Sequence, residues 1–97
     1  MNTRAKGSYF ERTVRKYLEK RGYFVVRQAA SSFPDLIAIT PSGAVWMIEC
    51  KVNKYLSKVE KEELMRLKLG YNANVYKSYP KYSTYSKNPK NVILEPL

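Results

Sequence analysis

The sequence contains no histidine, one cysteine and one aspartate among its 97 residues. Without histidine, it has no Ser-His-Asp triad, no imidazole metal ligand and no histidine-dependent nuclease site. A single cysteine excludes an internal disulfide and a cysteine-rich zinc site. Carboxylates are therefore the side chains left to hold a metal ion.

Long apolar segments are also missing. The longest uncharged run, Leu36 to Ile48, is interrupted by Pro41 and Gly43 and is shorter than the roughly 20 residues of a membrane helix. No cleavable signal segment is recognisable. We therefore expect one domain over residues 1–97, soluble and cytoplasmic, with a single modest core and no membrane partner.

Negative charge is scarce, because 18 Lys and Arg face only eight Asp and Glu, for a formal net charge of +10. Such an excess favours polyanionic partners, and nucleic acid is the first candidate because binding a phosphate releases counterions. The alternative is a basic surface without a partner.

Residues 8–21 are predicted to form a helix, because Phe10, Val14 and Leu18 recur at helical spacing. On a helical wheel, Glu11 falls at the edge of this apolar arc. Its carboxylate is therefore able to face a sheet packed on the helix.

Five segments are predicted as strands from their β-branched and aromatic content and their flanking turns. A hairpin turn at residues 41–43 joins the second segment to the third, and the first three segments form a meander behind the first helix. The segments are 23–27, 36–40, 44–52, 74–79 and 91–95.

A second helix is predicted to begin at Ser57, which forms a capping box with Glu60, and to end at Gly70. Its apolar residues form two stripes about 150° apart on the helical wheel, so one core contact does not bury both. The stripes are Leu64 with Leu67, and Met65 with Leu69.

The second stripe needs another partner. We expect Met65 and Leu69 to lie in a homodimer interface, and the alternative is that they pack under the C-terminal segment.

Asp35 is the only aspartate, and thirteen residues separate it from Glu49. Because strand side chains alternate between faces, Glu49 and Lys51 point the same way and Cys50 points into the opposite layer. If Asp35 opens the neighbouring strand, the two carboxylates lie together and make an oxygen site suited to Mg²⁺ or Mn²⁺. The alternative is a set of surface charges.

These residues belong to a larger pattern. The chain resembles the archaeal Holliday junction resolvases, which are members of the restriction-endonuclease-like PD-(D/E)XK superfamily, over roughly residues 4–79. The matching pieces are Lys6-Gly7, Glu11-Arg12, Gly22 to Arg27, Ser31, Asp35 to Ala38, and Glu49-Cys50-Lys51.

The resemblance implies an α/β fold with a restriction-endonuclease-like mixed sheet of about five strands flanked by two helices. It implies that Asp35, Glu49 and Glu11 hold Mg²⁺, for which Mn²⁺ substitutes, with the backbone carbonyl of Cys50. Lys51 would orient or activate the attacking water, and Ser31 would lie near the scissile phosphate. The cations expected to bind DNA are Lys6, Arg12, Arg27 and Lys54.

The implied function is a homodimeric endonuclease, of archaeal or archaeal-virus origin, that nicks four-way junctions symmetrically and leaves 5′-phosphate and 3′-hydroxyl ends. The positions matching Met65 and Leu69 lie in the family's dimer interface. One alternative keeps the chemistry on another substrate, as a nickase or single-strand nuclease. The other is a non-catalytic basic module that binds nucleic acid.

The C-terminal segment departs from the family pattern, with tyrosines at every third position interleaved with lysines. Such residues are able to stack on bases while they bind phosphate, and the alternative is that the tyrosines pack on the sheet. The tyrosines are Tyr76, Tyr79, Tyr82 and Tyr85, and the lysines are Lys77, Lys81 and Lys87.

Overall fold

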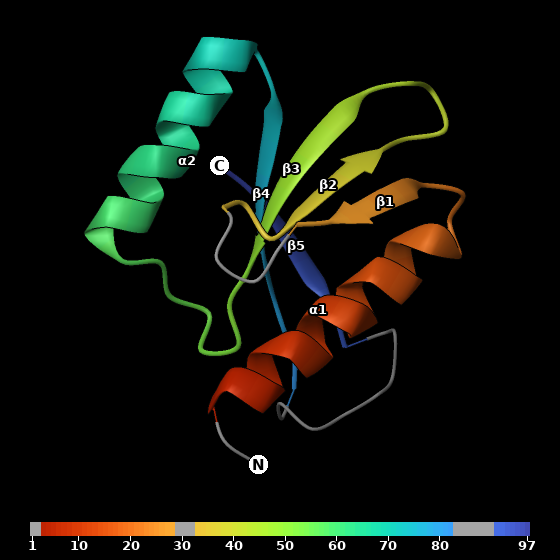
Figure 1. The fold of residues 1–97 in the computed structure, drawn as a ribbon, viewed down its shortest axis with the longest axis vertical. Coiled ribbons are helices and arrows are strands. Elements are labelled where there is room, and N and C mark those ends of the chain that lie inside the picture. The colour runs from red at the N-terminus through yellow and green to blue at the C-terminus, as the bar shows by residue number, and fades with distance from the viewer. Residues whose placement is uncertain (1–2, 29–32, 83–90) are drawn as a thin grey trace.

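The computed structural model describes residues 3–28, 33–82 and 91–97, with side chains from residue 7 onward. Five strands form one sheet in the order β1-β2-β3-β4-β5, in which β3 and β4 are parallel and the other neighbours are antiparallel. The predicted mixed sheet of five strands with two helices is confirmed (Figure 1). The elements are α1 (Thr3–Glu19), β1 (Phe24–Arg27), β2 (Leu36–Ile39), β3 (Val45–Cys50), α2 (Lys58–Tyr71), β4 (Asn74–Tyr79) and β5 (Ile93–Pro96).

The main core lies between α1 and one face of the sheet. Trp46 stacks on Tyr76 with 4.2 Å between ring centroids, and its ring centroid lies 5.1 Å from that of Tyr23 in an edge-on contact. These three aromatic rings pack against the core. This packing holds α1 across the first three strands, which brings the polar edge of the helix to the end of the sheet. The buried apolar residues of this core are Phe10, Val14, Leu18, Leu36, Ala38, Ile48 and Val92.

Helix α2 makes the crossover that the parallel strands β3 and β4 require, and it packs on β4. The predicted capping box is confirmed, because the Glu60 N–H donates to Ser57 Oγ and the Ser57 N–H donates to Glu60 Oε1. The predicted end at Gly70 is wrong. The helix continues to Tyr71, and Asn72 adopts the left-handed C-cap conformation with φ 51°, which asparagine tolerates.

Other predicted boundaries also differ. Helix α1 spans Thr3–Glu19 rather than residues 8–21, and β5 spans Ile93–Pro96 rather than residues 91–95. Strand β3 ends at Cys50 rather than at residue 52. Lys51 therefore lies directly after β3, where its backbone N–H donates to the Ser78 carbonyl of β4 at 2.8 Å.

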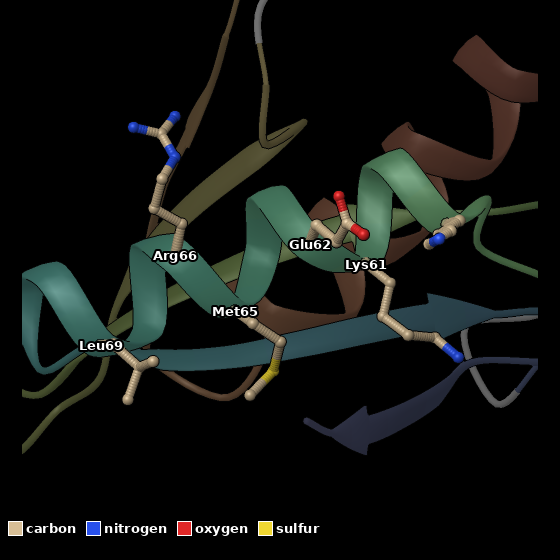
Figure 2. A pocket seen from close by; sticks show the side chains of 6 residues that line it. Lys61, Glu62, Met65, Arg66 and Leu69 are labelled. Atoms are coloured by element: carbon tan, nitrogen blue, oxygen red, sulfur yellow. The ribbon is translucent and has the colours of Figure 1, made fainter.

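The two apolar stripes of α2 are buried unequally, as expected from their angular separation. Leu64 is fully buried, Met65 is half-buried and Leu69 is 80% exposed. Figure 2 shows Met65 and Leu69 pointing the same way from α2. The pocket on this helix is lined by Lys58, Lys61, Glu62, Met65, Arg66 and Leu69.

Neither α1 nor α2 is long and apolar enough to cross a membrane, within the parts of the chain that the structure describes.

Candidate active site

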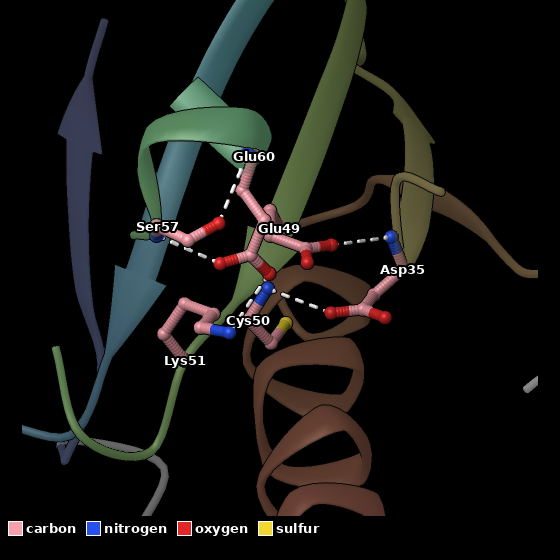
Figure 3. A network of polar contacts seen from close by, with 6 residues as sticks. All are labelled: Asp35, Glu49, Cys50, Lys51, Ser57 and Glu60. Carbon is pink, nitrogen blue, oxygen red and sulfur yellow. Dashed lines mark hydrogen bonds and ion pairs between the residues drawn. The ribbon is translucent and has the colours of Figure 1, made fainter. Parts of the chain in front are cut away.

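Asp35 and Glu49 lie beside each other at the end of the β2–β3 pair. Asp35 directly precedes β2, and the antiparallel register that pairs Leu36 with Ile48 brings it next to Glu49. The Asp35 N–H donates to Glu49 Oε1 at 3.1 Å, and the Cys50 N–H donates to Asp35 Oδ2 at 2.9 Å (Figure 3). Each carboxylate is therefore held by the backbone beside the other.

Glu11 approaches Asp35 from α1. Its side chain is only 17% exposed, and Arg27 Nε donates to Glu11 Oε2 at 3.0 Å. Burial raises the pKa of Glu11, the contact with Asp35 raises it further, and Arg27 opposes this effect. The wheel position at the edge of the apolar arc thus does place this carboxylate beside the strand ends.

Glu49 is 6% exposed. Burial first, and then the hydrogen bonding and charge of Asp35, raise the pKa of Glu49 to about 9. Among the described residues, neither Asp35 nor Glu49 forms an ion pair. The centre therefore holds two adjacent carboxylates without a cation to balance them.

This donor set fits a hard divalent ion. Magnesium is commonly held by one or two carboxylates and keeps several waters, and a cation would favour the ionised form of both groups. Within the described residues, no three His, Cys, Asp or Glu side chains are grouped closely enough to hold a metal ion. The structure thus presents Asp35 with Glu49 as a two-carboxylate site and places Glu11 beside Asp35.

Lys51 lies next to the acidic pair, but its ammonium is bonded elsewhere. Lys51 Nζ lies 2.8 Å from Glu60 Oε2 in the first turn of α2, and both side chains are 25% exposed. Burial raises the pKa of Glu60, but hydrogen bonds from Lys51 and Ser57 outweigh it and the pKa is lowered overall. The sequence had indicated Glu60 only as a capping residue, since the strand period does not predict which helix position meets Lys51.

Cys50 is a core residue, as predicted from its position between Glu49 and Lys51. Its side chain packs against the main core. Burial and the surrounding carboxylates raise the pKa of its thiol well above the ordinary value, so the thiolate is disfavoured. Its backbone carbonyl remains a predicted metal ligand.

The predicted DNA-binding cations lie in different settings. Arg12 is exposed on α1, and Arg27 is exposed but bonded to Glu11. Lys54 is exposed in the loop between β3 and α2 and has a left-handed backbone with φ 75°. Lys6 belongs to α1, but its side chain lies outside the described part of the structure, and Ser31 lies outside it entirely.

Some tyrosines of the C-terminal segment pack against other side chains, and others are exposed. Tyr76 stacks on Trp46, in agreement with the packing alternative. Tyr79 is half-buried and has Lys54 and Lys77 within 5.8 Å and 5.3 Å of its ring centroid.

Tyr82 is 67% exposed, and Lys81 Nζ lies 5.4 Å from its ring centroid. Tyr55, which was not singled out in the sequence, is also exposed, with Lys54 Nζ 5.9 Å from its ring centroid. Tyr85 and Lys87 lie outside the described residues.

Comparison with known proteins identifies relatives of this chain. A crossover junction endodeoxyribonuclease Hjc from Methanocaldococcus jannaschii is 42% identical over 64 residues, which cover 62% of this chain and 47% of the relative. This chain thus matches about half the length of that curated relative.

Comparison with solved structures also finds a Holliday junction resolvase. The Holliday junction resolvase Hjc of Archaeoglobus fulgidus matches with a TM-score of 0.67 and 28% identity, over 90% of this chain and 72% of that chain. A VRR_NUC domain shares the fold, with a TM-score of 0.59 and 21% identity over 74% of this chain and 82% of that chain.

The archaeal Holliday junction resolvase (Hjc) family matches residues 2–79, which include every described residue of the acidic centre and Lys51. This chain therefore belongs to the archaeal Holliday junction resolvase family.

Proposed function

We propose that this chain is a metal-dependent, structure-selective DNA endonuclease that nicks four-way junctions symmetrically as a homodimer. The observation that carries the proposal is the hydrogen-bonded pair of Asp35 and the buried Glu49, in a chain that belongs to a resolvase family. The named relatives are a crossover junction endodeoxyribonuclease and a Holliday junction resolvase, which supports the same substrate here.

Asp35 and Glu49 would hold Mg²⁺ or Mn²⁺, with Glu11 completing the acidic set and the Cys50 carbonyl as a further ligand. Such an ion would supply a water of lowered pKa and positive charge at the phosphate. The backbone N–H groups of Asp35 and Cys50 donate to Glu49 and Asp35 respectively, which fixes the positions of the two carboxylates. Such positioning favours phosphodiester hydrolysis. We expect the cut to leave 5′-phosphate and 3′-hydroxyl ends.

The cations have a separate task. Lys51 would orient the attacking water and stabilise charge on the phosphate, because it follows Glu49 by two residues and its ammonium is held by Glu60. Arg12, Arg27 and Lys54, together with Lys6, would bind the DNA backbone, and Ser31 would lie near the scissile phosphate. Such contacts supply affinity that depends on salt rather than on sequence.

A homodimer suits the substrate, because a four-way junction that is cut in two strands needs two symmetry-related sites. The exposed Leu69 beside Met65 supports the α2 surface predicted from the sequence. These two residues are few for a stable interface, which buries about 800 Å² per partner.

The structure offers a second and larger apolar surface, which we call the open sheet face. Strand register places two rows of apolar side chains on the side of β1, β2 and β3 opposite the main core, and the four that are exposed are Phe24, Val26, Ile39 and Val45. A contiguous apolar patch of this kind marks an interaction site. The two rows are Phe24, Ile39 and Val45, and Val26, Ile37 and Met47.

A nuclease with another specificity, such as a nickase or single-strand nuclease, is the second candidate. The exposed Tyr55 and Tyr82, each with a lysine near its ring, favour it because aromatic and cationic side chains together bind unpaired strands. A non-catalytic basic module is the third, and it predicts that Mg²⁺ only weakens DNA binding.

Cleavage of a four-way junction, a linear duplex and a single strand, side by side over a Mg²⁺ titration, tests the proposal. We expect cleavage that needs the metal and is confined to the junction. Preferential cleavage of the single strand or of one duplex strand would support the second candidate. DNA binding that only weakens as Mg²⁺ is added, without cleavage, would support the third.

A further inference from the structure

Lys51 and the first turn of α2 are joined by a single carboxylate. Glu60 uses its two oxygens for different partners, since Oε2 pairs with Lys51 Nζ at 2.8 Å and Oε1 accepts from the Ser57 N–H at 2.9 Å. Figure 3 shows this carboxylate between the lysine and the helix start, beside Glu49. One side chain therefore connects the helix cap to the proposed active site.

Lys51 is held at both ends by this arrangement. Its backbone N–H donates to the Ser78 carbonyl in β4 at 2.8 Å, and its ammonium pairs with Glu60. A free lysine side chain samples many rotamers and loses that freedom when its ammonium is fixed. A partner that fixes the ammonium before substrate arrives removes part of that cost from the reaction.

The setting makes this contact stronger than an ordinary surface pair. Glu60 and Lys51 are each 25% exposed, and Glu60 is itself oriented by the capping box. By contrast, the pair formed one turn later by Glu63 and Arg66 has side chains that are 45% and 73% exposed. A pair that is partly buried and held by a second hydrogen bond is less screened and loses less freedom on forming.

We propose that Glu60 is a positioning residue of the nuclease site, which fixes the Lys51 ammonium and ties its position to the start of α2. The inference rests on the proposed role of Lys51 in cleavage. Glu60 makes no hydrogen bond to the acidic pair among the described residues, so its bonded connection to the site runs through Lys51. Its charge also contributes to the raised pKa of Glu49.

Two substitutions separate positioning from helix capping. Glu60→Gln keeps a side-chain oxygen for the Ser57 N–H and removes the carboxylate that pairs with Lys51. Ser57→Ala removes the cap and leaves the Glu60 carboxylate. Glu63→Gln is the matched control, because it makes the same chemical change in an ion pair on the same helix.

We expect Glu60→Gln to lower kcat for junction cleavage by about 10- to 100-fold, the size of effect typical of residues that orient an active-site group, with little change in KM. Ser57→Ala should lower Tm by several degrees and leave kcat close to that of the wild type. Glu63→Gln should change neither. Wild-type kcat in Glu60→Gln, or an equal loss of kcat in Ser57→Ala, overturns the inference.

A second measurement does not depend on cleavage. NMR of the ¹⁵N-labelled lysine side chains should show the Lys51 ammonium protected from exchange with water in the wild type and in Glu63→Gln, and unprotected in Glu60→Gln. The same spectrum for Lys51 in all three proteins overturns the inference even if the wild type cleaves junctions. A wild type that shows this protection but cuts no DNA overturns the proposed function and leaves the Glu60 contact established.

Discussion

Asp35 and Glu49 are locked together by backbone hydrogen bonds at the end of two antiparallel strands. Asp35 donates its N–H to Glu49 Oε1 at 3.1 Å, and the residue after Glu49 donates its own N–H to Asp35 Oδ2 at 2.9 Å. Two carboxyl groups are thereby kept adjacent in a site where Glu49 is almost fully buried, and burial and Asp35 raise the pKa of Glu49 to about 9. A cation that replaces the Glu49 proton would favour the ionised form of the pair, so the site is suited to bind one.

Neutralising either member of this pair should stop cleavage and spare binding. We expect Asp35→Asn and Glu49→Gln each to lower the cleavage rate by at least about 100-fold, as for removal of a preorganised electrostatic group. Junction affinity in a gel-shift assay should stay within a few-fold, because the cationic surface supplies it.

The control for this pair is Glu19→Gln, which removes an exposed glutamate at the far end of α1. It should cleave like the wild type. Undiminished cleavage by Asp35→Asn or by Glu49→Gln would show that the acidic pair is not the catalytic centre.

Stability without metal should fall as the pH rises. The pKa of Glu49 is about 9 in the folded protein against an ordinary value of 4.5. Because the folded state holds this proton more tightly, the stability it contributes is fully present below pH 4.5 and is lost as the pH rises to 9. We expect a loss of at least about 1.4 kcal/mol in the free energy of unfolding, the equivalent of one pKa unit.

Thermal melts in chelator between pH 5 and pH 9 measure this loss. The glutamine side chain in Glu49→Gln does not titrate, so this variant should show a flatter profile of Tm against pH. Added Mg²⁺ should restore Tm most at the alkaline end, since the ion favours the charged pair. Parallel profiles for the wild type and Glu49→Gln would contradict the assignment.

The proposed dimer is testable at two surfaces. A charge placed in an apolar interface loses its hydration, so Leu69→Glu on α2 and Ile39→Lys on the open sheet face should each weaken self-association by at least about tenfold if its surface is buried. Sedimentation velocity reads the result, with Glu19→Gln as the control. If a variant stays dimeric, the surface that carries its substitution is not the interface. If the wild type is monomeric at micromolar concentration, the proposed dimer is wrong.

The exposed tyrosines should contribute to DNA affinity. We expect Tyr55→Ala and Tyr82→Ala each to weaken binding to a junction or single strand by about 5- to 100-fold, as for the loss of one base-stacking contact, with less effect on duplex. Tyr76→Phe is the control, because Tyr76 stacks on Trp46 in the core. Equal affinity in all four proteins would favour a packing role for these rings.

Much of the fold was predictable from local pattern. The capping box at Ser57 and Glu60 marked the start of α2, and strand 74–79 was placed at its observed bounds. The C-terminal end of α2 was missed because glycine is not required where asparagine tolerates the left-handed C-cap. Propensity favoured Gly70, and the observed cap is Asn72.

The part of the site that lies at the strand ends was predictable from the alternation of strand side chains. Alternation placed Glu49 apart from Cys50, and the hairpin brought Asp35 alongside. The partner of Lys51 was not predictable, because it depends on how α2 sits on the sheet after the crossover loop. The open sheet face was missed for a similar reason, since which face a helix covers is decided by packing rather than by alternation.

Mapping the nicks that the wild type makes in a four-way junction with Mg²⁺ tests the central claim most directly. We expect paired nicks at symmetry-related positions on opposite strands, with 5′-phosphate and 3′-hydroxyl ends, and none with Asp35→Asn or in chelator. Unpaired nicks scattered over junction and duplex alike, or paired nicks that persist in Asp35→Asn, would contradict it.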